Sequence, residues 1–264
     1  MIDNPRSPRV RAVAKLAKRS AREETGLFLV EGPQSVSEAL AFHPEHVVEL
    51  FVAAPSLDRH AHLVRAAGEA GIAAETVTDA VLDAMADTVT PQGILATCRQ
   101  LPVTVAELVA RKPRLVAILE EVRDPGNAGT IIRAADAVGA DGVILTGNSV
   151  DAYNPKVVRS TTGSIFHVPV AQKATLGEAL AAVRGAGLQA LAADVKGADL
   201  PRVRDALAAP TAWVFGNEAR GLEDDQLRLV DRVVKLPIYG RAESLNLATA
   251  ASVCLYESAF AQRA

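Results

Sequence analysis

The sequence predicts an α/β protein with a larger C-terminal domain and a smaller N-terminal one. From residue 115 onward, short apolar runs alternate with helical segments, which is typical of a mostly parallel sheet covered on both faces. Several apolar runs end in small and polar residues, after Leu119, Phe215 and Ile238. Ligands of such sheets bind where the strands end, so these turns predict one cleft, provided that their strands are neighbours.

The composition is that of a folded protein of one or two domains. The chain has 264 residues, of which 49% are hydrophobic, and a net charge of −3. Cys98 and Cys254 stand far apart among apolar or small neighbours, so we expect buried free thiols and a reducing compartment. The first residues lack a signal peptide's apolar core, and no run approaches the roughly 18 apolar residues of a membrane span. We therefore expect a soluble, cytoplasmic protein.

The N-terminal domain, residues 1–98, is predicted as a small alternating α/β unit. Val10, Val13 and Leu16 have helical spacing, and Gly26 is expected to end that helix. The pattern predicts helices over 8–22, 35–41, 60–70 and 78–87, and strands over 27–30, 47–53, 73–77 and 94–98. Two prolines, Pro102 and Pro113, mark residues 99–114 as a linker.

The C-terminal domain, residues 115–264, is predicted to repeat strand and helix. Strands are expected over 115–119, 142–145, 165–170, 189–193, 212–215 and 233–236. Helices are expected over 127–138, 155–161, 176–185, 203–208, 223–229 and 245–262. The last helix is long and apolar, which suits either packing within the chain or an interface between two chains.

Positive charge gathers at the N-terminus although the whole chain is slightly acidic. Residues 1–22 contain a single acid, Asp3, and the basic residues Arg6, Arg9, Arg11, Lys15, Lys18, Arg19 and Arg22. Such a patch attracts a phosphate backbone, but it also suits a solvated helix face. The charge pattern alone leaves both interpretations open.

Two other kinds of site are disfavoured. A dinucleotide-binding turn needs G-x-G-x-x-G and a later acid, whereas the turn at 126–129 has too few glycines and Leu145 is followed by no acid. This argues against NAD. The histidine pairs His43/His46 and His60/His62 suggest a metal, but we find no cysteine or acid to complete either set, and we predict surface histidines.

Three motifs follow one another at a characteristic spacing in the C-terminal domain. They are Asn127-x-Gly129-x-x-x-Arg133, Gly216-Asn217-Glu218 with Gly221, and Ser244-Leu245-Asn246 with Ala248. In this order they resemble the SpoU (TrmH-like) family of RNA 2′-O-ribose methyltransferases, within the SPOUT superfamily. The resemblance is strong over residues 113–262. It is weaker over 8–98, which is similar to the accessory RNA-binding domain ahead of many SpoU domains.

The resemblance implies a SPOUT-type trefoil knot, S-adenosylmethionine as cofactor and a homodimer. RNA is the implied substrate, and the accessory domain favours ribosomal RNA, notably 23S, over tRNA. By motif position, the cofactor pocket is expected to contain Gly216, Asn217, Leu236, Ile238 and Leu245. RNA contacts are expected from Lys18, Arg22 and Arg159. Leu236 and Ile238 also suit ordinary strand core.

The same resemblance assigns catalysis to Arg133, Asn127, Glu218, Ser244 and Asn246. A guanidinium fork suits the phosphate beside the attacked ribose hydroxyl. The family proposal also lets Arg133 accept the hydroxyl proton, although arginine rarely deprotonates. Asn127 is expected to orient Arg133 or the ribose, and Glu218 to pair with Arg133. Asn127, Ser244 and Asn246 also suit helix caps.

Two other functions remain open at this stage. The first alternative is a non-catalytic RNA-binding protein that keeps the fold, and the second is a nucleotide-cofactor enzyme of another class. The joint presence of Asn127, Arg133 and Glu218 argues against the first, and the missing glycine and acid argue against the second.

Overall fold

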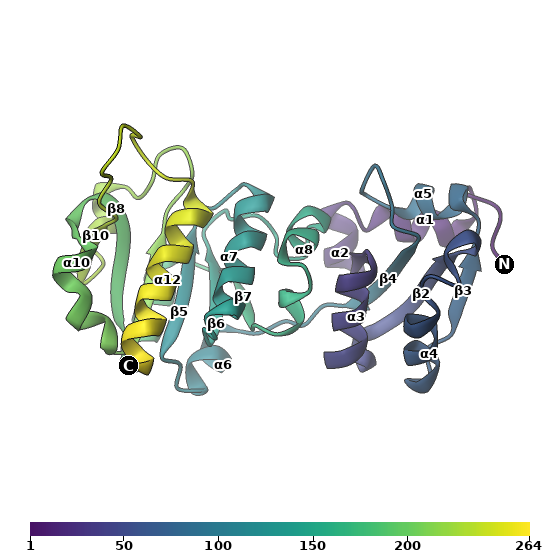
Figure 1. Cartoon of the computed structure of the whole chain (residues 1–264), viewed down its shortest axis with the longest axis horizontal. Coiled ribbons are helices and arrows are strands. Elements are labelled where there is room, and N and C mark those ends of the chain that lie inside the picture. Colours follow the sequence, from purple (N-terminus) through teal and green to yellow (C-terminus); the bar gives the residue numbers. More distant parts are fainter. The chain divides into compact units, whose positions relative to one another are not determined.

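The computed structural model describes residues 1–264, which form two compact units. The N-terminal unit comprises residues 1–101 and 153–167, and the C-terminal unit residues 102–152 and 168–264 (Figure 1). This division differs from the predicted domains 1–98 and 115–264. Residues 153–167 join the N-terminal unit because Tyr153, Val158 and Phe166 are buried in its core.

A four-stranded mixed sheet forms the centre of the N-terminal unit, in the order β1-β4-β2-β3. β4 runs antiparallel to β1 and β2, and β2 is parallel to β3. The strands are β1 (Leu27–Glu31), β2 (Val47–Ala53), β3 (Ala74–Val77) and β4 (Ile94–Arg99). The helices are α1 (Pro8–Lys15), α2 (Arg19–Thr25), α3 (Pro33–Phe42), α4 (Ala61–Glu69), α5 (Asp79–Met85) and α8 (Pro155–Thr161), with short 3-10 turns η1 (Pro44–His46), η2 (Ala54–Ser56) and η3 (Ser164–Phe166).

Alternate residues of these strands pack into two separate cores. Phe28 and Val30 of β1 face the core that α3 and α4 complete. Leu29 faces the opposite core, built with α1 and α5. This period of two is what a strand with helices on both faces requires. The alternating α/β architecture predicted for this part of the chain is confirmed.

The predicted helix over residues 8–22 is observed as two helices, α1 and α2. The break between them also changes the role of Arg22. The chain turns at residues 16–18, where α1 leaves carbonyl groups without helical partners. Arg22 is only 2% exposed and donates from Nη1 to the carbonyl oxygens of Leu16 and Ala17 at 2.8 and 2.9 Å. A buried guanidinium in this position stabilises the turn and has no surface to offer RNA, so the prediction of an RNA contact at Arg22 is wrong.

The C-terminal unit is built on a six-stranded sheet in the order β10-β8-β9-β5-β6-β7, and every pairing in it is parallel. The predicted parallel sheet is therefore confirmed. The strands are β5 (Leu115–Glu120), β6 (Gly142–Thr146), β7 (Val170–Ala174), β8 (Gln189–Asp199), β9 (Thr211–Phe215) and β10 (Arg232–Lys235). The helices are α6 (Val105–Ala110), α7 (Pro125–Ala137), α9 (Leu176–Gly185), α10 (Leu200–Val203), α11 (Asp224–Leu227) and α12 (Leu247–Arg263), with the 3-10 turn η4 (Arg204–Ala208).

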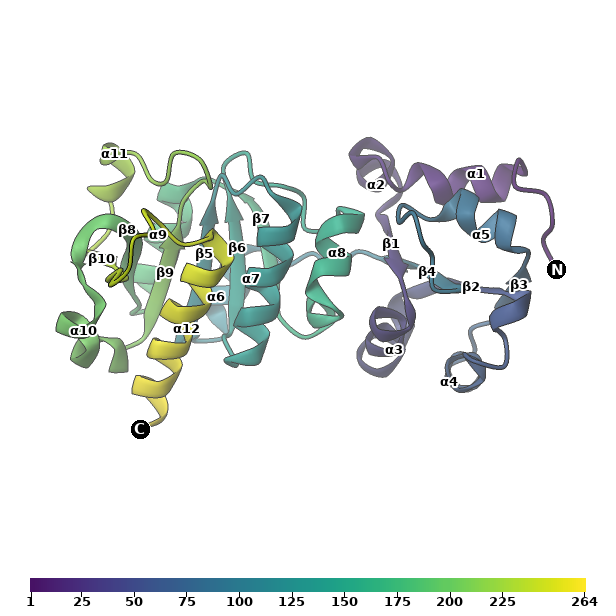
Figure 2. The same cartoon turned by 45° about the horizontal axis from the view of Figure 1, so that its top comes forward.

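Helices cover both faces of this sheet. α7 and α12 lie side by side on one face, as both views show (Figures 1 and 2). On the other face, α6 and α9 pack on inward residues such as Ile118, Ile144 and Val214. Strands buried on both faces are mostly apolar. Every residue of β5 and β9 is buried, and these strands are apolar except for Glu120 and Thr211 at their ends.

Two predicted elements differ from the observed ones. Residues 165–170 were expected as a strand, but Ile165 and Phe166 lie in η3 with both side chains in the N-terminal core, and β7 begins only at Val170. The expected linker 99–114 contains α6, which begins with a capping box of Thr104 and Glu107. Burial of Leu108 ties this helix to the core of the C-terminal unit.

Both cysteines are buried free thiols, as predicted. Burial raises the pKa of the Cys254 thiol to about 12 and also raises the pKa of Cys98, so neither is a ready nucleophile. No helix is both long enough and apolar enough to cross a membrane.

A buried hydrogen bond between Trp213 of β9 and Ser258 of α12 predicts the effect of one mutation. Both side chains are fully buried, and the indole N–H donates to the Ser258 hydroxyl at 2.8 Å. Ser258→Ala leaves that N–H without a partner and is expected to destabilise the protein by about 1–3 kcal/mol in urea unfolding. Ser252→Ala is the control, because its hydroxyl bonds only to Ala248 of its own helix. Equal losses in both variants would contradict the assigned role of Ser258.

Candidate active site

A cavity of about 370 Å³ lies at the carboxyl ends of β8, β9 and β10. This is the edge at which ligands of parallel sheets bind. Four of the residues predicted to hold a cofactor line it, namely Asn217, Leu236, Ile238 and Leu245. Glu218 and Ser244 line it as well, so residues from the second and third motifs meet at one cavity.

The wall contributed by β8 was missed by the sequence analysis, which ended this strand at Ala193. Pairing with β10 jumps from Ala192 to Ala198, so the residues between them leave the ladder and border the cavity. Gly197 allows the strands to rejoin, because a Cβ there would lie 2.4 Å from the backbone of Val233. The residues added to the site in this way are Ala193, Asp194, Val195 and Lys196. The sequence signal that could have revealed this wall is the run of small and polar residues that follows the apolar part of the strand.

Gly216 does not line the cavity but closes the turn that does. A Cβ at this position would lie 2.5 Å from the backbone of Gly221, closer than real contacts allow. The backbones of Asn217 and Gly221 bond to each other in both directions, at 3.2 and 2.8 Å. Gly221 itself has φ +67°, which favours glycine. Glycine is therefore required at position 216 because the backbone of Gly221 packs directly against it, and at position 221 because of its positive φ.

The carboxylate of Glu218 binds the loop between β5 and α7. It accepts backbone N–H groups from Arg123 at 3.2 Å and Asp124 at 3.0 Å, and the Asn127 amide at 3.4 Å. The expected pair between Glu218 and Arg133 is not formed, because Arg133 makes no ion pair within the chain. Glu218 instead joins the second motif to the first.

Asn246 joins the third motif to the first. Its Oδ1 accepts from the N–H groups of Ala248 and Thr249 and caps α12, while its Nδ2 donates to Asn127 Oδ1 at 3.0 Å. Asn127 is not a cap, since Asp124 caps α7. Ser244 is exposed and is not a cap. Hydrogen bonds through Asn127 thus connect segments that lie more than 90 residues apart in sequence.

Arg133 lies on the solvent side of α7 and makes no hydrogen bond or ion pair within the chain. It is not among the residues that line the cavity. Its guanidinium is therefore free to bind an anion from outside the chain. No contact in the structure tests the catalytic role of Arg133, which stays a prediction.

Two acids at the end of β5 also belong to this edge of the sheet, although the sequence analysis assigned them no role. Glu121 has φ +51°, accepts the Arg220 guanidinium, and offers its carbonyl oxygen to Asn217 Nδ2 at 2.8 Å. Glu120 is buried and accepts from Thr146, and burial raises the pKa of its carboxyl while that hydrogen bond acts in the opposite sense. A non-glycine residue at positive φ marks a constrained loop.

The predicted RNA contacts in the N-terminal unit have different surroundings. Lys18 is exposed. Arg159 of α8 binds Glu31 and, at 2.8 Å, Asp87. Burial alone would lower the pKa of Arg159, but the hydrogen bond to Asp87 and the pair with Glu31 outweigh it and raise the pKa. Arg159 is thus already engaged by two carboxylates.

Comparison with known proteins places this geometry in a family. Residues 114–256 match the SpoU rRNA Methylase family, and residues 7–96 match the MRM3-like substrate binding domain. The chain belongs to the SpoU rRNA methylase family. The RlmP 23S rRNA (guanosine(2553)-2′-O)-methyltransferase of Bacillus subtilis is 33% identical over 97% of each chain. A 23S rRNA (uridine(2479)-2′-O)-methyltransferase of Streptomyces viridochromogenes is 32% identical over 93% of this chain and 86% of its own.

Solved SpoU structures share the fold over almost the full length. The SpoU methyltransferase AviRb from Streptomyces viridochromogenes, in complex with the cofactor AdoMet, superposes with a TM-score of 0.83 at 30% identity, covering 97% of this chain and 99% of that one. An AdoMet-bound rRNA methyltransferase from Sinorhizobium meliloti gives 0.81 at 29% identity, with 97% and 96% covered. The predicted family and fold class are therefore confirmed.

Gly216→Ala is expected to weaken binding of S-adenosylmethionine at least ~10-fold, because the added Cβ must displace the backbone that forms the turn. Gly240→Ala is the matched control, since a Cβ there meets nothing within 4 Å. Isothermal titration of both variants, each checked for its thermal midpoint, measures the effect. Unchanged affinity in Gly216→Ala would contradict the role of this turn.

Proposed function

We propose that this SpoU protein is an S-adenosylmethionine-dependent methyltransferase that methylates a ribose 2′-hydroxyl of 23S ribosomal RNA. The observation that carries the proposal is the cavity at the strand ends, lined by Asn217 and Leu245 from separate motifs. Relatives that match nearly the whole chain are named 23S rRNA 2′-O-methyltransferases, and solved relatives contain AdoMet. The substrate and the cofactor are proposed for this chain on that support.

The cavity has the composition that an adenosine-containing cofactor needs. Leu236, Ile238 and Leu245 provide apolar surface for the adenine ring, and the tight turn of residues 216–221 presents backbone groups to its polar edge. Gly216 keeps that turn closed, and Asn217 holds it through the side-chain oxygen that accepts from Ala219 at 3.0 Å. Bound there, the cofactor supplies an electrophilic methyl group on a sulfonium.

Arg133 is proposed to clamp the phosphate beside the target ribose. It is the exposed, unpaired cation on α7, the helix whose first turn is held by Glu218 and Asn246. A phosphate held in place keeps the neighbouring 2′-hydroxyl in position for attack on the methyl group, and such positioning speeds the reaction of a weak nucleophile. Accepting the hydroxyl proton is the further role that the family suggests for Arg133. Asn127, Glu218 and Asn246 act as positioning residues, and Ser244 lines the cavity where it can bond to a ligand.

The N-terminal unit is proposed to bind ribosomal RNA with α1. Arg11 and Lys15 lie four residues apart on α1, and Lys18 follows in the turn before α2. All three are exposed and make no ion pair within the chain. Arg9 is different, because it pairs with Glu49 and Glu75. Three unpaired cations, two on α1 and one in the turn that follows it, are suited to a phosphate backbone. Arg159 would contact RNA only where a phosphate competes with its two carboxylate partners.

The test is methyl transfer from labelled S-adenosylmethionine to 23S rRNA and tRNA transcripts, with ribose methylation mapped. We expect methylation of 23S rRNA, and loss of roughly 100-fold or more of the rate in Arg133→Ala with cofactor affinity nearly unchanged. Arg111→Ala, a change at another exposed arginine, is the control. Methylation of tRNA alone would support the tRNA alternative. Cofactor or RNA binding without transfer would support the non-catalytic one, and near-normal turnover of Arg133→Ala would refute the clamp.

We also propose a homodimer that uses the exposed face of α12, and a knotted C-terminal chain, as the family suggests. Val253, Tyr256 and Phe260 share this face, and Phe260 is 58% exposed. Arg133 and Val253 lie at a similar height on adjacent helices, about 9–11 Å beyond Asn127 and Asn246. A dimer formed here would bring Arg133 near the partner chain.

Phe260→Glu is expected to shift the protein from dimer to monomer, because it places a charge in the proposed apolar contact. Val89→Glu is the control, since Val89 is also an exposed apolar residue but lies in the other unit. Light scattering after size-exclusion chromatography measures the mass of each variant. A wild-type monomer, or a dimer that survives Phe260→Glu, would refute this interface.

A further inference from the structure

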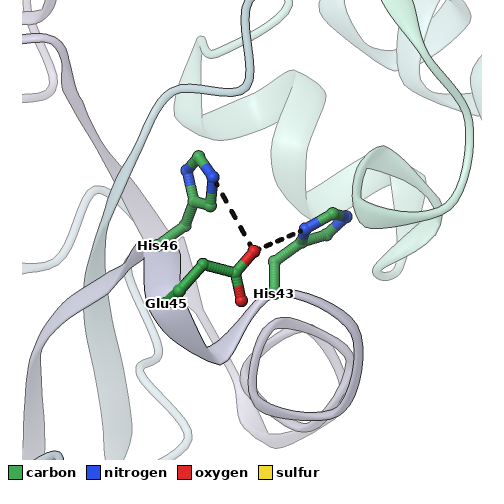
Figure 3. A group of neighbouring side chains, drawn as sticks. All are labelled: His43, Glu45 and His46. Atoms are coloured by element: carbon green, nitrogen blue, oxygen red, sulfur yellow. Dashed lines mark hydrogen bonds and ion pairs between the residues drawn. The ribbon is translucent and has the colours of Figure 1, made fainter.

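Two histidines and a glutamate converge at the end of α3 in the N-terminal unit. His43 follows α3 directly, and Glu45 and His46 lie in η1. Figure 3 shows the Glu45 carboxylate between the two imidazole rings. Its Oε1 lies 3.2 Å from His43 Nδ1 and 3.8 Å from His46 Nε2. The sequence analysis found no acid to complete this histidine pair, and that statement is wrong.

The outer nitrogen of each ring faces a backbone carbonyl. His43 Nε2 lies 3.0 Å from the carbonyl oxygen of Phe166, and His46 Nδ1 lies 3.3 Å from that of Arg99. A carbonyl only accepts hydrogen bonds, so each of these nitrogens carries the proton of its neutral ring. The lone pairs of the neutral rings, on His43 Nδ1 and His46 Nε2, then point toward the carboxylate.

Lone pairs that face a carboxylate repel it unless a cation lies between them. The cation is either extra protons on the rings or a metal ion. Histidines that bind metals almost always donate their other N–H to a carbonyl or carboxylate, which fixes the tautomer and the ring orientation. Both His43 and His46 have this arrangement.

We propose that His43, Glu45 and His46 bind a zinc ion. Two imidazoles and a carboxylate, with water as a fourth ligand, form a set that zinc accepts. The three ligand atoms lie within 4.8 Å of one another. Tetrahedral zinc holds its ligand atoms about 3.4 Å apart, so the cluster must contract slightly. The side chain of Glu45 is 63% exposed and is free to make that movement.

The surroundings set limits on the affinity. The Glu45 carboxylate contributes a negative charge that attracts a cation to the cluster. The Arg99 guanidinium, however, donates to the Glu45 carbonyl oxygen at 3.3 Å and adds a positive charge nearby. We therefore expect moderate rather than very tight binding.

The zinc would brace three segments of the N-terminal unit. His43 closes α3, His46 reaches the end of β4 through the Arg99 carbonyl, and His43 reaches η3 through the Phe166 carbonyl. Residues 153–167 also join this unit through packing, the Arg159 pairs, the contact of His167 with Glu38 and the hydrogen bond from Leu101 to Tyr153. The role assigned to zinc is structural, and it does not depend on the proposed methyl transfer.

Titration of the metal-free full-length protein with Zn²⁺, and separately with Co²⁺ followed by its visible absorption, tests the site. We expect one ion per chain, a Co²⁺ spectrum of low coordination number and a raised thermal midpoint. Glu45→Gln and His46→Ala should each weaken binding at least ~10-fold. His62→Ala is the control, because His62 is an exposed histidine outside the cluster.

Each variant is compared with the wild type in its metal-free thermal midpoint, so that loss of the fold is not taken for loss of a ligand. Absence of saturable binding by the wild type would mean that protons alone separate the lone pairs from the carboxylate, and would overturn the proposal. Binding that survives both Glu45→Gln and His46→Ala, or that disappears in His62→Ala, would overturn it as well.

Discussion

The hydrogen bonds to the Glu218 carboxylate determine how the segments at the cavity edge of the sheet are arranged. This carboxylate comes from the turn after β9 and accepts the backbone N–H groups of Arg123 and Asp124, which begin the path into α7. Hydrogen bonds from two backbone donors and one amide satisfy a charged group that lies beside a cavity. This contact fixes where α7 begins, and the start of α7 in turn fixes Asn127 and the helix that carries Arg133.

The neighbouring contacts extend the same constraint to the cavity. Asn127 accepts from the side-chain nitrogen of Asn246, whose side-chain oxygen caps α12, so the third motif is held against the first. Glu121 holds the opposite side of the turn through Asn217 and Arg220. Side chains that resembled independent helix caps in the sequence thus form one connected network. Such a network lets residues with no ligand contact of their own influence the cofactor pocket.

The sequence predicted the sheet and the site residues better than it predicted how they contact one another. Apolar runs identified strands such as β5 and β9, which are buried on both faces, but misplaced β7, which begins at the last residue of the predicted strand. Sequence periodicity could not show that Arg22 folds back onto the carbonyl groups of Leu16 and Ala17, or that Phe166 packs in the N-terminal core. Those contacts depend on tertiary packing. Glu218 was predicted to belong to the site, but its backbone partners have no side-chain signature that a sequence reveals.

Hydrogen exchange of the full chain, with and without S-adenosylmethionine, tests the coupling of these segments most directly. The cofactor should slow exchange at residues 194–196, 217–222 and 234–247, the segments that supply residues to the cavity wall. It should also slow exchange at residues 122–130, which do not line the cavity but are tied to it through Glu218 and Asn246. Protection confined to the N-terminal unit, or none at residues 122–130 when the cavity is occupied, would contradict the account.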